Sequence, residues 1–338
     1  MKVLQWGFGA MGSGMVRQIL ERDNVELVGV IDANPDLVGK DVGEVLGLGR
    51  TIGVKIGNDP GAALRSLKPD VTMLATGSFV TEVFDLLKMI MEAGSNAITI
   101  AEEMAFPWRI YPEYSQKLDE IARQNNVTLL GTGINPGFVL DLLVLVLTGV
   151  CGHVDKISAA RINDLSPFGP TVMRTQGVGT SPEEFAEGVE KGTIVGHIGF
   201  QQSIAMIAAA LGWELDEIKE TKEAIISKTQ RESKYVKVEP GMVAGCRQRG
   251  YGIMQGKTVI EMDHPQQIQP EKENVFTGDY IKIDGDMHID MSMKPEVPGG
   301  LGTINVAVNM IPHVFAARAG LLSMVDLPIP HCWEKIQA

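Results

Sequence analysis

The sequence has few of the residues that mark secreted, metal-binding or nucleic-acid-binding proteins. Its 338 residues include only three cysteines, without CxxC spacing, which argues against a zinc site or a disulfide framework and fits a reducing cytoplasm. Lys and Arg number 30 against 42 Asp and Glu, and the net charge of -12 argues against nucleic acid or an anionic membrane as partner. We therefore expect a cytoplasmic protein that binds a small molecule.

Long apolar runs are also missing. The longest, from Phe138 to Val150, is interrupted by Asp141 and is shorter than the roughly 20 residues that a membrane span requires. We expect a buried helix there. The N-terminal MKVLQWG does not have the charged and then apolar pattern of a secretory signal, and we expect none.

The first 140 residues alternate short apolar runs with amphipathic stretches, which is typical of parallel βα units. Right-handed crossovers would place the helices on both faces of one parallel sheet. The pattern predicts an α/β protein whose residues 1–140 form a Rossmann-type, doubly wound dinucleotide-binding domain. The expected strands cover residues 2–6, 26–32, 71–75, 96–100 and 127–130, and the expected helices cover 11–21, 80–93 and 112–125.

After residue 140 the pattern predicts an α+β substrate and oligomerisation domain with an open mixed sheet over residues 141–300. Asp284-Gly285-Asp286 indicates a hairpin between its last two strands. Residues 301–338 would return to the first domain, with a helix over 303–317 that contains Pro312. Within the second domain, strands are expected over 154–162, 242–254, 257–262, 280–283 and 287–293, and helices over 182–191 and 199–211.

A GxGxxG motif, Gly7 to Gly12, lies between the first expected strand and the first expected helix. Gly7 permits a tight turn, Gly9 lets the backbone approach a pyrophosphate, and Gly12 permits close helix packing. The N–H groups at the helix start, around Ala10 and Met11, would hold the anion. The motif in this context predicts a nicotinamide dinucleotide as cofactor.

Asp32 ends the second expected strand, 20 residues after Gly12, where a carboxylate can accept both hydroxyls of the adenosine ribose. Its charge should repel a 2′-phosphate, so NAD is favoured without excluding NADP. Ala75, Thr76 and Gly77 follow the third expected strand, at the sheet edge where ligands bind in open α/β folds. We expect them to contact the cofactor.

Six segments spread over nearly the whole chain stand out: VLQWGFGAMGSGM, ITIAEEMAFP, GTGINPGFVLD, RIND, GHIGFQQS and PGGLGTINVAVNMIP. Together they resemble the 2,4-diaminopentanoate dehydrogenase family, which has a dihydrodipicolinate-reductase-like dinucleotide domain and is grouped with native amine dehydrogenases. The histidine pair, lysine and DAPSGT pattern of dihydrodipicolinate reductase itself is absent.

The resemblance implies NAD(P)-dependent oxidation of the C4 amine of 2,4-diaminopentanoate, which yields 2-amino-4-oxopentanoate and ammonia. A broader amine dehydrogenase or an imine reductase of the same fold is an alternative. A non-catalytic NAD-binding sensor is another, because a fold does not dictate a function.

Amine oxidation needs a base, since an ammonium cannot release hydride before it loses a proton, and water must then attack the iminium. A carboxylate serves both steps and stabilises the iminium charge. Glu102 and Glu103 follow the 96–100 strand, and we expect Glu102 to be catalytic, with Glu103 as the alternative. The alternative is that neither is catalytic and that both only place negative charge at the start of the next helix. Asn135 and Pro136, after the fifth strand, would shape the nicotinamide pocket.

A diamino acid also has a carboxylate to be held. Arg161 offers a bidentate fork for it, and Asn163 lies on the same face of the same expected strand; the alternative is a surface ion pair. By resemblance His197 and His264 also contact the substrate, His264 as a carboxylate partner. The alternatives are a core histidine at the start of a helix for His197 and a turn for His264.

No metal is expected, because hairpin chemistry explains the acidic residues near His288 and amine oxidation needs no cation. A homodimer through the second-domain sheet is expected, since two-fold dimers are the commonest assemblies of soluble proteins.

Overall fold

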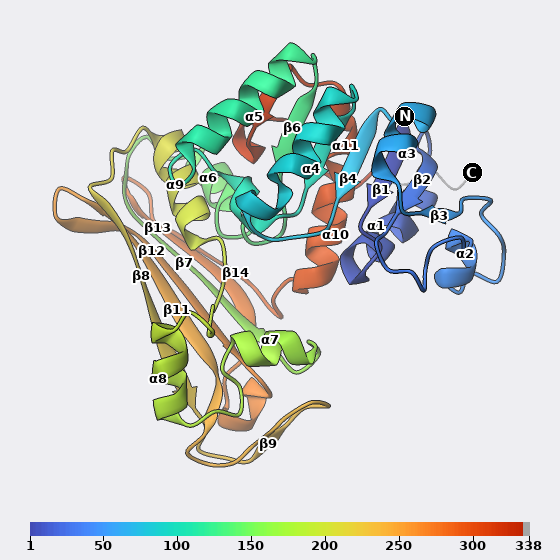
Figure 1. Cartoon of the computed structure of the whole chain (residues 1–338). Helices are drawn as coiled ribbons and strands as arrows, with labels where there is room; N and C mark the ends of the chain where they lie inside the picture. The colour runs from blue at the N-terminus through green and yellow to red at the C-terminus, as the bar shows by residue number, and fades with distance from the viewer. Residues whose placement is uncertain (334–338) are drawn as a thin grey trace. The chain divides into compact units, whose positions relative to one another are not determined.

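The computed structural model describes residues 1–333 and divides the chain into two compact units (Figure 1). Unit 1 contains Met1–Phe138 and Pro298–Ala338, and unit 2 contains Val139–Val297. The chain therefore leaves unit 1 once and returns to it. In the described part of the chain, no helix combines the length and apolar character that a bilayer crossing requires.

Unit 1 is built on a seven-stranded sheet in the order β15-β6-β5-β4-β1-β2-β3, with every pairing parallel. The order reverses beside β1, as in doubly wound nucleotide-binding folds. The predicted Rossmann-type fold is thus confirmed. The strands are β1 Lys2–Trp6, β2 Glu26–Ile31, β3 Ile56–Gly57, β4 Val71–Leu74, β5 Asn96–Thr99, β6 Thr128–Gly131 and β15 Gly320–Leu322.

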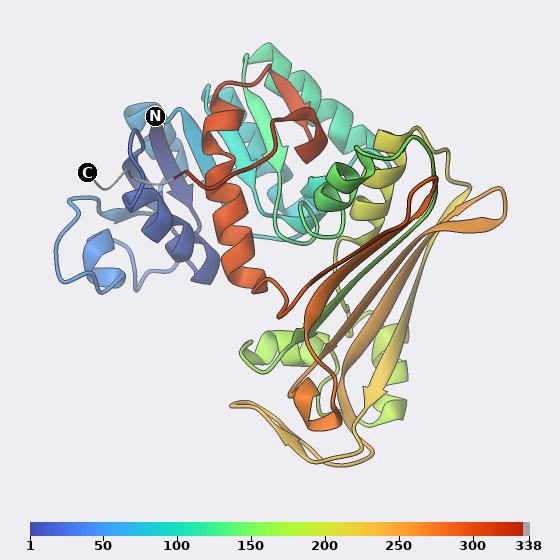
Figure 2. The same cartoon turned by 180° about the vertical axis from the view of Figure 1, so that it is seen from behind.

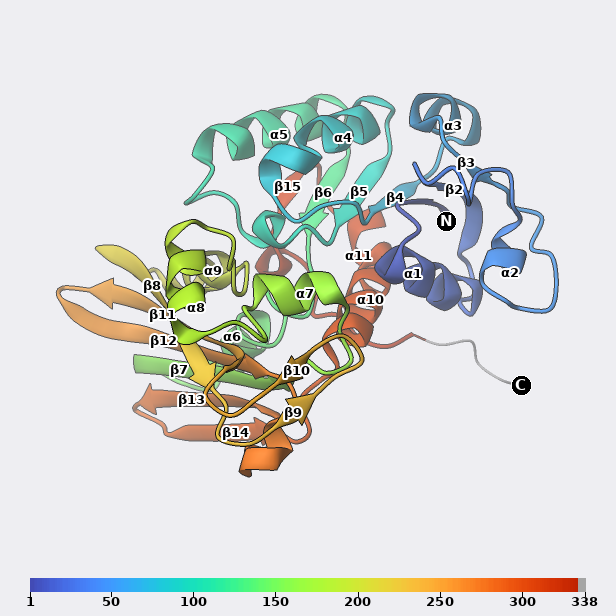
Figure 3. The ribbon, with the colours of Figure 1, turned by 60° about the horizontal axis from the view of Figure 1, so that its bottom comes forward.

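The helices of unit 1 cover both faces of this sheet, with α4 and α5 on one face and α10 and α11 on the other (Figure 3). The single helix predicted over 303–317 is wrong: the chain breaks at Met310, and Pro312, which lacks an N–H, lies in the first turn of a second helix. The helices are α1 Ala10–Leu20, α2 Val42–Val45, α3 Pro60–Leu67, α4 Val80–Glu92, α5 Pro112–Gln124, α10 Gly299–Asn309 and α11 Ile311–Phe315, with the 3-10 turns η1 Glu102–Ala105 and η3 Met324–Asp326.

Helix α10 runs parallel to α1 and beside it (Figure 2). Met11 lies against Gly300, and one helical turn further Gly14 lies against Ile304. A Cβ on Gly14 would approach Ile304 Cδ1 to 2.3 Å, so any larger residue there would displace the end of the Ile304 side chain. The start of α10 is therefore placed next to the start of α1.

Unit 2 is built on a six-stranded mixed sheet in the order β14-β13-β7-β12-β11-β8, in which β7 and β12 are parallel and their other neighbours antiparallel. The open mixed sheet and the hairpin after Asp284 are as predicted. The edge strand β8 was not predicted, because its sequence EIKETKEAII is rich in charged residues, as edge strands often are. The strands are β7 Val154–Asp164, β8 Glu217–Ile226, β9 Arg231–Glu232, β10 Lys237–Val238, β11 Val243–Met254, β12 Lys257–Gln267, β13 Gly278–Gly285 and β14 Ile289–Met293.

His264 lies inside β12 and pairs with Gln248 of β11, so the turn considered for this position is wrong. Its neighbour Pro265 has no N–H, and the register of β12 with β7 skips these two residues. A proline inside a strand was the signal that suggested a turn.

One face of the unit 2 sheet carries α8 and α9 (Figure 1). Phe200 and Ile204 of α9 pack on Gly250 of β11, where a Cβ would approach Phe200 Cδ2 to 2.9 Å. The apolar run after Phe138 contains the helix α6, as predicted, but the helix is only partly buried, since Val146 is 40% exposed. The helices are α6 Leu142–Thr148, α7 Pro170–Thr175, α8 Pro182–Glu190 and α9 Phe200–Leu211, with the 3-10 turn η2 Pro270–Glu273.

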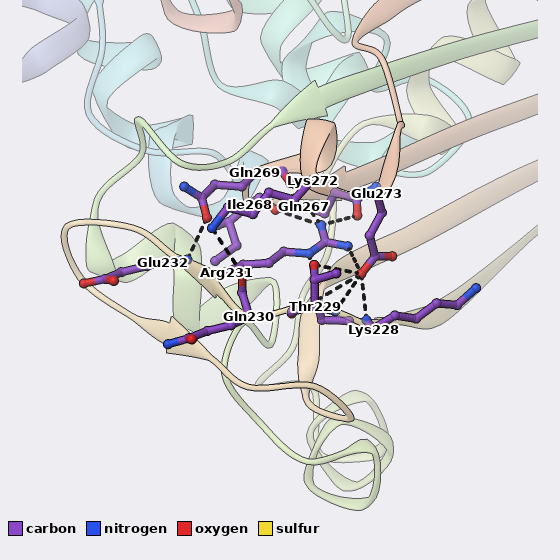
Figure 4. Close-up of polar contacts among 11 residues, drawn as sticks. Lys228, Thr229, Gln230, Arg231, Glu232, Gln267, Ile268, Gln269, Lys272 and Glu273 are labelled. Atoms are coloured by element: carbon purple, nitrogen blue, oxygen red, sulfur yellow. Dashed lines mark hydrogen bonds and ion pairs between the residues drawn. The ribbon is translucent and has the colours of Figure 1, made fainter.

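Arg231, which is fully buried, holds the β9–β10 hairpin at its base (Figure 4). Its Nε donates to Ser227 Oγ at 2.8 Å, and its Nη1 donates to Gln267 Oε1 at 2.7 Å and to the Ile268 carbonyl at 2.9 Å. Nη2 lies 2.9 Å from Glu273 Oε1. Because a buried guanidinium requires partners, this network ties the hairpin to the end of β12 and to η2.

Candidate active site

The glycine loop after β1 has the geometry of a pyrophosphate cradle. Gly7 has a φ of 91°, and a Cβ there would lie 2.4 Å from the Ala75 carbonyl oxygen. A Cβ on Gly12 would lie 1.9 Å from the Gly7 carbonyl oxygen, whereas a Cβ on Gly9 would meet no atom within 4 Å. Helix α1 begins after Gly9 without a side-chain cap. Two glycines are thus needed for packing, and the third faces open space beside uncapped N–H groups, which fits a bound phosphate.

Asp32, at the end of β2, is tied to this loop. Its Oδ2 accepts a hydrogen bond from the Phe8 N–H at 2.6 Å, and its Oδ1 accepts one from the Asn34 N–H at 2.8 Å. An ionised carboxylate has about four acceptor positions, so each oxygen retains capacity for a hydroxyl donor. Asp32 therefore has a fixed orientation that suits two ribose hydroxyls.

The segment after β4 lies against the same loop. The Cγ2 of Thr76 and the carbonyl of Ala75 border Gly7. A Cβ on Gly77 would lie 2.7 Å from Glu82 Oε2, which also accepts from the Ser78 N–H at 3.2 Å. The structure thus brings the predicted 75–77 segment next to the glycine loop.

Glu102 and Glu103 open η1, directly beyond the carboxyl end of β5, and have different surroundings. Glu103 is buried, and its two oxygens accept from the Val80 N–H at 2.8 Å and from the Tyr111 hydroxyl at 2.6 Å. Glu103 thus binds the first turn of α4. Glu102 is half-buried, and burial raises its pKa; the charges of Glu103 and Glu82 add to the rise against an opposing Ser78 hydrogen bond. The two carboxylates thus differ: Glu103 has a hydrogen-bond donor on each oxygen, whereas Glu102 is a half-buried carboxyl group with a raised pKa.

The loop after β6 carries Asn135 and Pro136, joined by a cis peptide bond. The Ile134 N–H donates to Thr303 Oγ1 of α10 at 3.2 Å, so this loop is bound to the start of α10. Thr303 was not singled out in the sequence, although it lies in the PGGLGTINV segment.

In unit 2, Arg161 of β7 forms a buried ion pair with Asp279 of β13. Arg161 Nη1 lies 2.6 Å from Asp279 Oδ1, and the two side chains are 3% and 0% exposed. Nη2 donates to the Val297 carbonyl, and Asp279 Oδ2 accepts from the Val297 N–H at 2.9 Å. Burial raises the pKa of Asp279, and Arg161 opposes the rise. The surface ion pair considered for Arg161 is therefore wrong, and sequence reasoning missed Asp279.

His264, Asn163 and His197 lie close to this pair. His264 Nε2 is 3.0 Å from Asn163 Oδ1, and the ring centroids of His197 and His264 are 4.9 Å apart. Burial lowers the pKa of His197 to about 3, and the Arg161 charge adds to the fall; burial also holds the pKa of His264 well below its usual range. The structure thus brings the four residues expected at the substrate together, as two neutral imidazoles, an amide and a guanidinium.

His197 precedes α9 instead of beginning it, because α9 begins at Phe200 after Gly199, whose φ is 127°. Gln248 of β11 holds the His197 backbone: its Oε1 accepts from the His197 N–H at 2.8 Å, and its Nε2 donates to the His197 carbonyl at 2.9 Å. The ring Nε2 of His197 is buried without a hydrogen-bond partner among residues 1–333. A polar atom in that state suggests a polar ligand.

The relationship to known proteins follows from two family models and a close relative. Residues 138–337 match the 2,4-diaminopentanoate dehydrogenase C-terminal domain, and residues 1–99 match the N-terminus of dihydrodipicolinate reductase. A 2,4-diaminopentanoate dehydrogenase from Acetoanaerobium sticklandii is 46% identical over 333 residues, which cover 97% of this chain and 94% of the relative. The chain belongs to the 2,4-diaminopentanoate dehydrogenase family.

More distant relatives are amine dehydrogenases. One from Streptomyces virginiae is 25% identical over 96% of this chain and 95% of its own. The structure of an amine dehydrogenase from Mycobacterium smegmatis matches with a TM-score of 0.87 and 27% identity, over 98% of this chain and 97% of that one. Membership in the 2,4-diaminopentanoate dehydrogenase family makes the chain an oxidoreductase that uses a nicotinamide cofactor.

Proposed function

We propose that this chain catalyses the reversible NAD(P)-dependent oxidative deamination of 2,4-diaminopentanoate at C4, which yields 2-amino-4-oxopentanoate and ammonia. The observation that carries the proposal is Glu102, a half-buried carboxylate with a raised pKa at the same sheet edge as the glycine loop. The activity in the name of the Acetoanaerobium relative supports the same reaction.

The residues present fit a nicotinamide dinucleotide. The backbone of Gly9, Ala10 and Met11 would hold its pyrophosphate, and Asp32 would accept its ribose hydroxyls. The segment 75–77 and Asn135 would line the rest of its site. When bound, the dinucleotide supplies the hydride acceptor for the oxidation.

Glu102 would handle the protons. Its carboxylate removes a proton from the C4 ammonium, so the nitrogen lone pair can form the C=N bond as hydride leaves C4. Once that proton has passed to solvent, the ionised carboxylate stabilises the iminium and takes a proton from the water that attacks C4. It then gives this proton to the nitrogen of the carbinolamine, and ammonia departs with the electrons of the C–N bond as the C4 hydroxyl loses its proton and becomes the carbonyl. Glu103, whose two oxygens accept from Val80 and Tyr111, is less suited to this task.

Arg161, Asn163, His197 and His264 would bind the amino acid end of the substrate. Because Asp279 already pairs with Arg161, the guanidinium would offer only its remaining N–H groups to the carboxylate. The buried Nε2 of His197 would gain a partner on binding. We further propose NAD as the preferred cofactor, because the negative charge of Asp32 at the ribose site would repel a 2′-phosphate.

A homodimer is also proposed, through the face of the unit 2 sheet that α9 does not cover. Ser158 leaves a hollow there between Asp263 and Tyr280. Lys156 pairs with Glu261 on the same sheet at 3.1 Å, so local charges offset one another. Light scattering of the purified protein tests this proposal, and a monomeric mass would contradict it.

The reaction is tested in the direction of amination. NADH consumption should require both ammonium and 2-amino-4-oxopentanoate. Oxidation of 2-aminopentane with a kcat/KM equal to that of the diamino acid would favour the broader amine dehydrogenase and exclude Arg161 as a main anchor. NADH binding without turnover of any of these compounds would favour a sensor.

A further inference from the structure

The turn η1 is fixed to three neighbouring parts of unit 1. The Glu103 N–H donates to the Ser78 carbonyl in the loop after β4 at 3.1 Å. The Met104 carbonyl packs on β6 so closely that a Cβ on Gly131 would lie 2.0 Å from its oxygen. The Tyr111 hydroxyl, at the start of α5, bonds the Glu103 carboxylate. The backbone that carries Glu102 therefore has little freedom.

The orientation of Glu102 follows from that of Glu103. A 3-10 turn has three residues per turn, so adjacent side chains diverge by about 120°. With the Glu103 carboxylate held inward by Val80 and Tyr111, the Glu102 side chain must point in another direction. A loosened Glu103 would therefore allow Glu102 to rotate away.

We infer that Glu103 and Tyr111 act together as positioning residues for Glu102, an inference that rests on the function proposed above. Tyr111 supplies a neutral donor to Glu103, since burial and the Glu103 carboxylate raise its pKa to about 12. The Val80 N–H and the Tyr111 hydroxyl each donate to one oxygen of the Glu103 carboxylate, at 2.8 Å and 2.6 Å, and so fix its orientation.

The charge on Glu103 has a second effect on Glu102. The groups that act on the Glu102 carboxylate are its own backbone N–H, which lowers the pKa, Ser78 in the loop after β4, Glu82 on α4 and Glu103 on η1 itself. The two carboxylates raise the Glu102 pKa, and Ser78 lowers it. Removal of the Glu103 charge should therefore lower the pKa of Glu102.

Two variants separate orientation from charge, and a third is the control. Tyr111→Phe removes one oxygen and loosens Glu103. Glu103→Gln keeps an acceptor for Val80 and the side-chain length but removes the charge. Tyr114→Phe alters the next aromatic residue of α5, which packs edge-on against Tyr111 with ring centroids 6.2 Å apart and takes no part in the Glu103 hydrogen bonds.

In Tyr111→Phe, kcat should fall roughly tenfold through misorientation while KM for the diamino acid and NADH affinity change less than about twofold. In Glu103→Gln, kcat at the plateau should stay within about threefold, and the acidic limb of the kcat/KM profile should move to lower pH. Tyr114→Phe should match the parent in both measurements.

Equal kcat values in Tyr111→Phe and Tyr114→Phe would overturn the inference, as would an unmoved acidic limb in Glu103→Gln. If Tyr111→Phe does not fold, the test depends on the acidic limb of the kcat/KM profile of Glu103→Gln alone. Failure of the proposed function is distinguishable, because the acidic limb would then persist in Glu102→Gln whatever the other variants do.

Discussion

Arg161→Met, made alone and together with Asp279→Asn, separates the role of Arg161 in substrate binding from its role in stability. Arg161 and Asp279 are 3% and 0% exposed and meet at 2.6 Å, so removal of the guanidinium leaves a buried carboxylate without its counter-ion. Loss of one partner from a buried ion pair costs about 3–5 kcal/mol. We expect the free energy of unfolding of unit 2 to fall by this amount.

Most of that loss comes from the Asp279 charge, so Arg161→Met combined with Asp279→Asn should recover most of it. The amide oxygen of the introduced asparagine would still accept from the Val297 N–H, and the residual cost should be about 1 kcal/mol, that of a neutral hydrogen bond. The pKa of Asp279 is raised by burial and should rise further without Arg161. A carboxyl group with a raised folded pKa is protonated at low pH and destabilises the fold only as pH rises through that pKa. The difference in unfolding free energy between Arg161→Met and the parent should therefore shrink toward acid pH.

Urea unfolding at acid and neutral pH measures the unfolding free energies of the two variants. KM for 2,4-diaminopentanoate measures the role of Arg161 in substrate binding. If Arg161 also binds the substrate carboxylate, the double variant should regain stability but keep a binding loss of roughly 2–5 kcal/mol. An Arg161→Met variant as stable as the parent would refute the reasoning about the buried pair. A normal KM in the double variant would restrict Arg161 to a structural role.

Three further substitutions test other parts of the chain. Asp32→Ser should lower kcat/KM with NAD and shift preference toward NADP; an unchanged ratio would remove Asp32 from the ribose site. Glu102→Gln should lower kcat by about 100-fold and abolish the acidic limb of kcat/KM, while NADH titration shows unchanged affinity. Arg231→Met should lower the free energy of unfolding by about 3 kcal/mol, because Glu273 loses a buried partner; a urea midpoint equal to that of the parent would contradict this.

The sequence predicted the architecture well where the determining pattern is local. Five strands of unit 1 (β1, β2, β4, β5 and β6) and the helices α1, α4 and α5 follow from apolar periodicity, whereas the short strands β3 and β15 were not predicted. The roles of Gly7 and Gly12 follow from turn geometry. Where tertiary contacts override the local sequence pattern, the predicted secondary structure was wrong or a strand was not predicted. Pro265 lies in a strand because its missing N–H falls at a gap in the register with β7, and β8 forms because β11 offers it a partner.

For the candidate site, the sequence by itself determined which residues carry suitable chemistry. Glu102 and Glu103 were both visible as acids beyond a strand, and the four residues expected at the substrate were chosen by their chemistry and by resemblance. Only the tertiary structure decided their surroundings. It bound Glu103 to Tyr111 and Val80, and it paired Arg161 with Asp279, 118 residues away in the chain. Burial and partners depend on which strands become neighbours, and no local pattern of residues encodes the electrostatic environment that results.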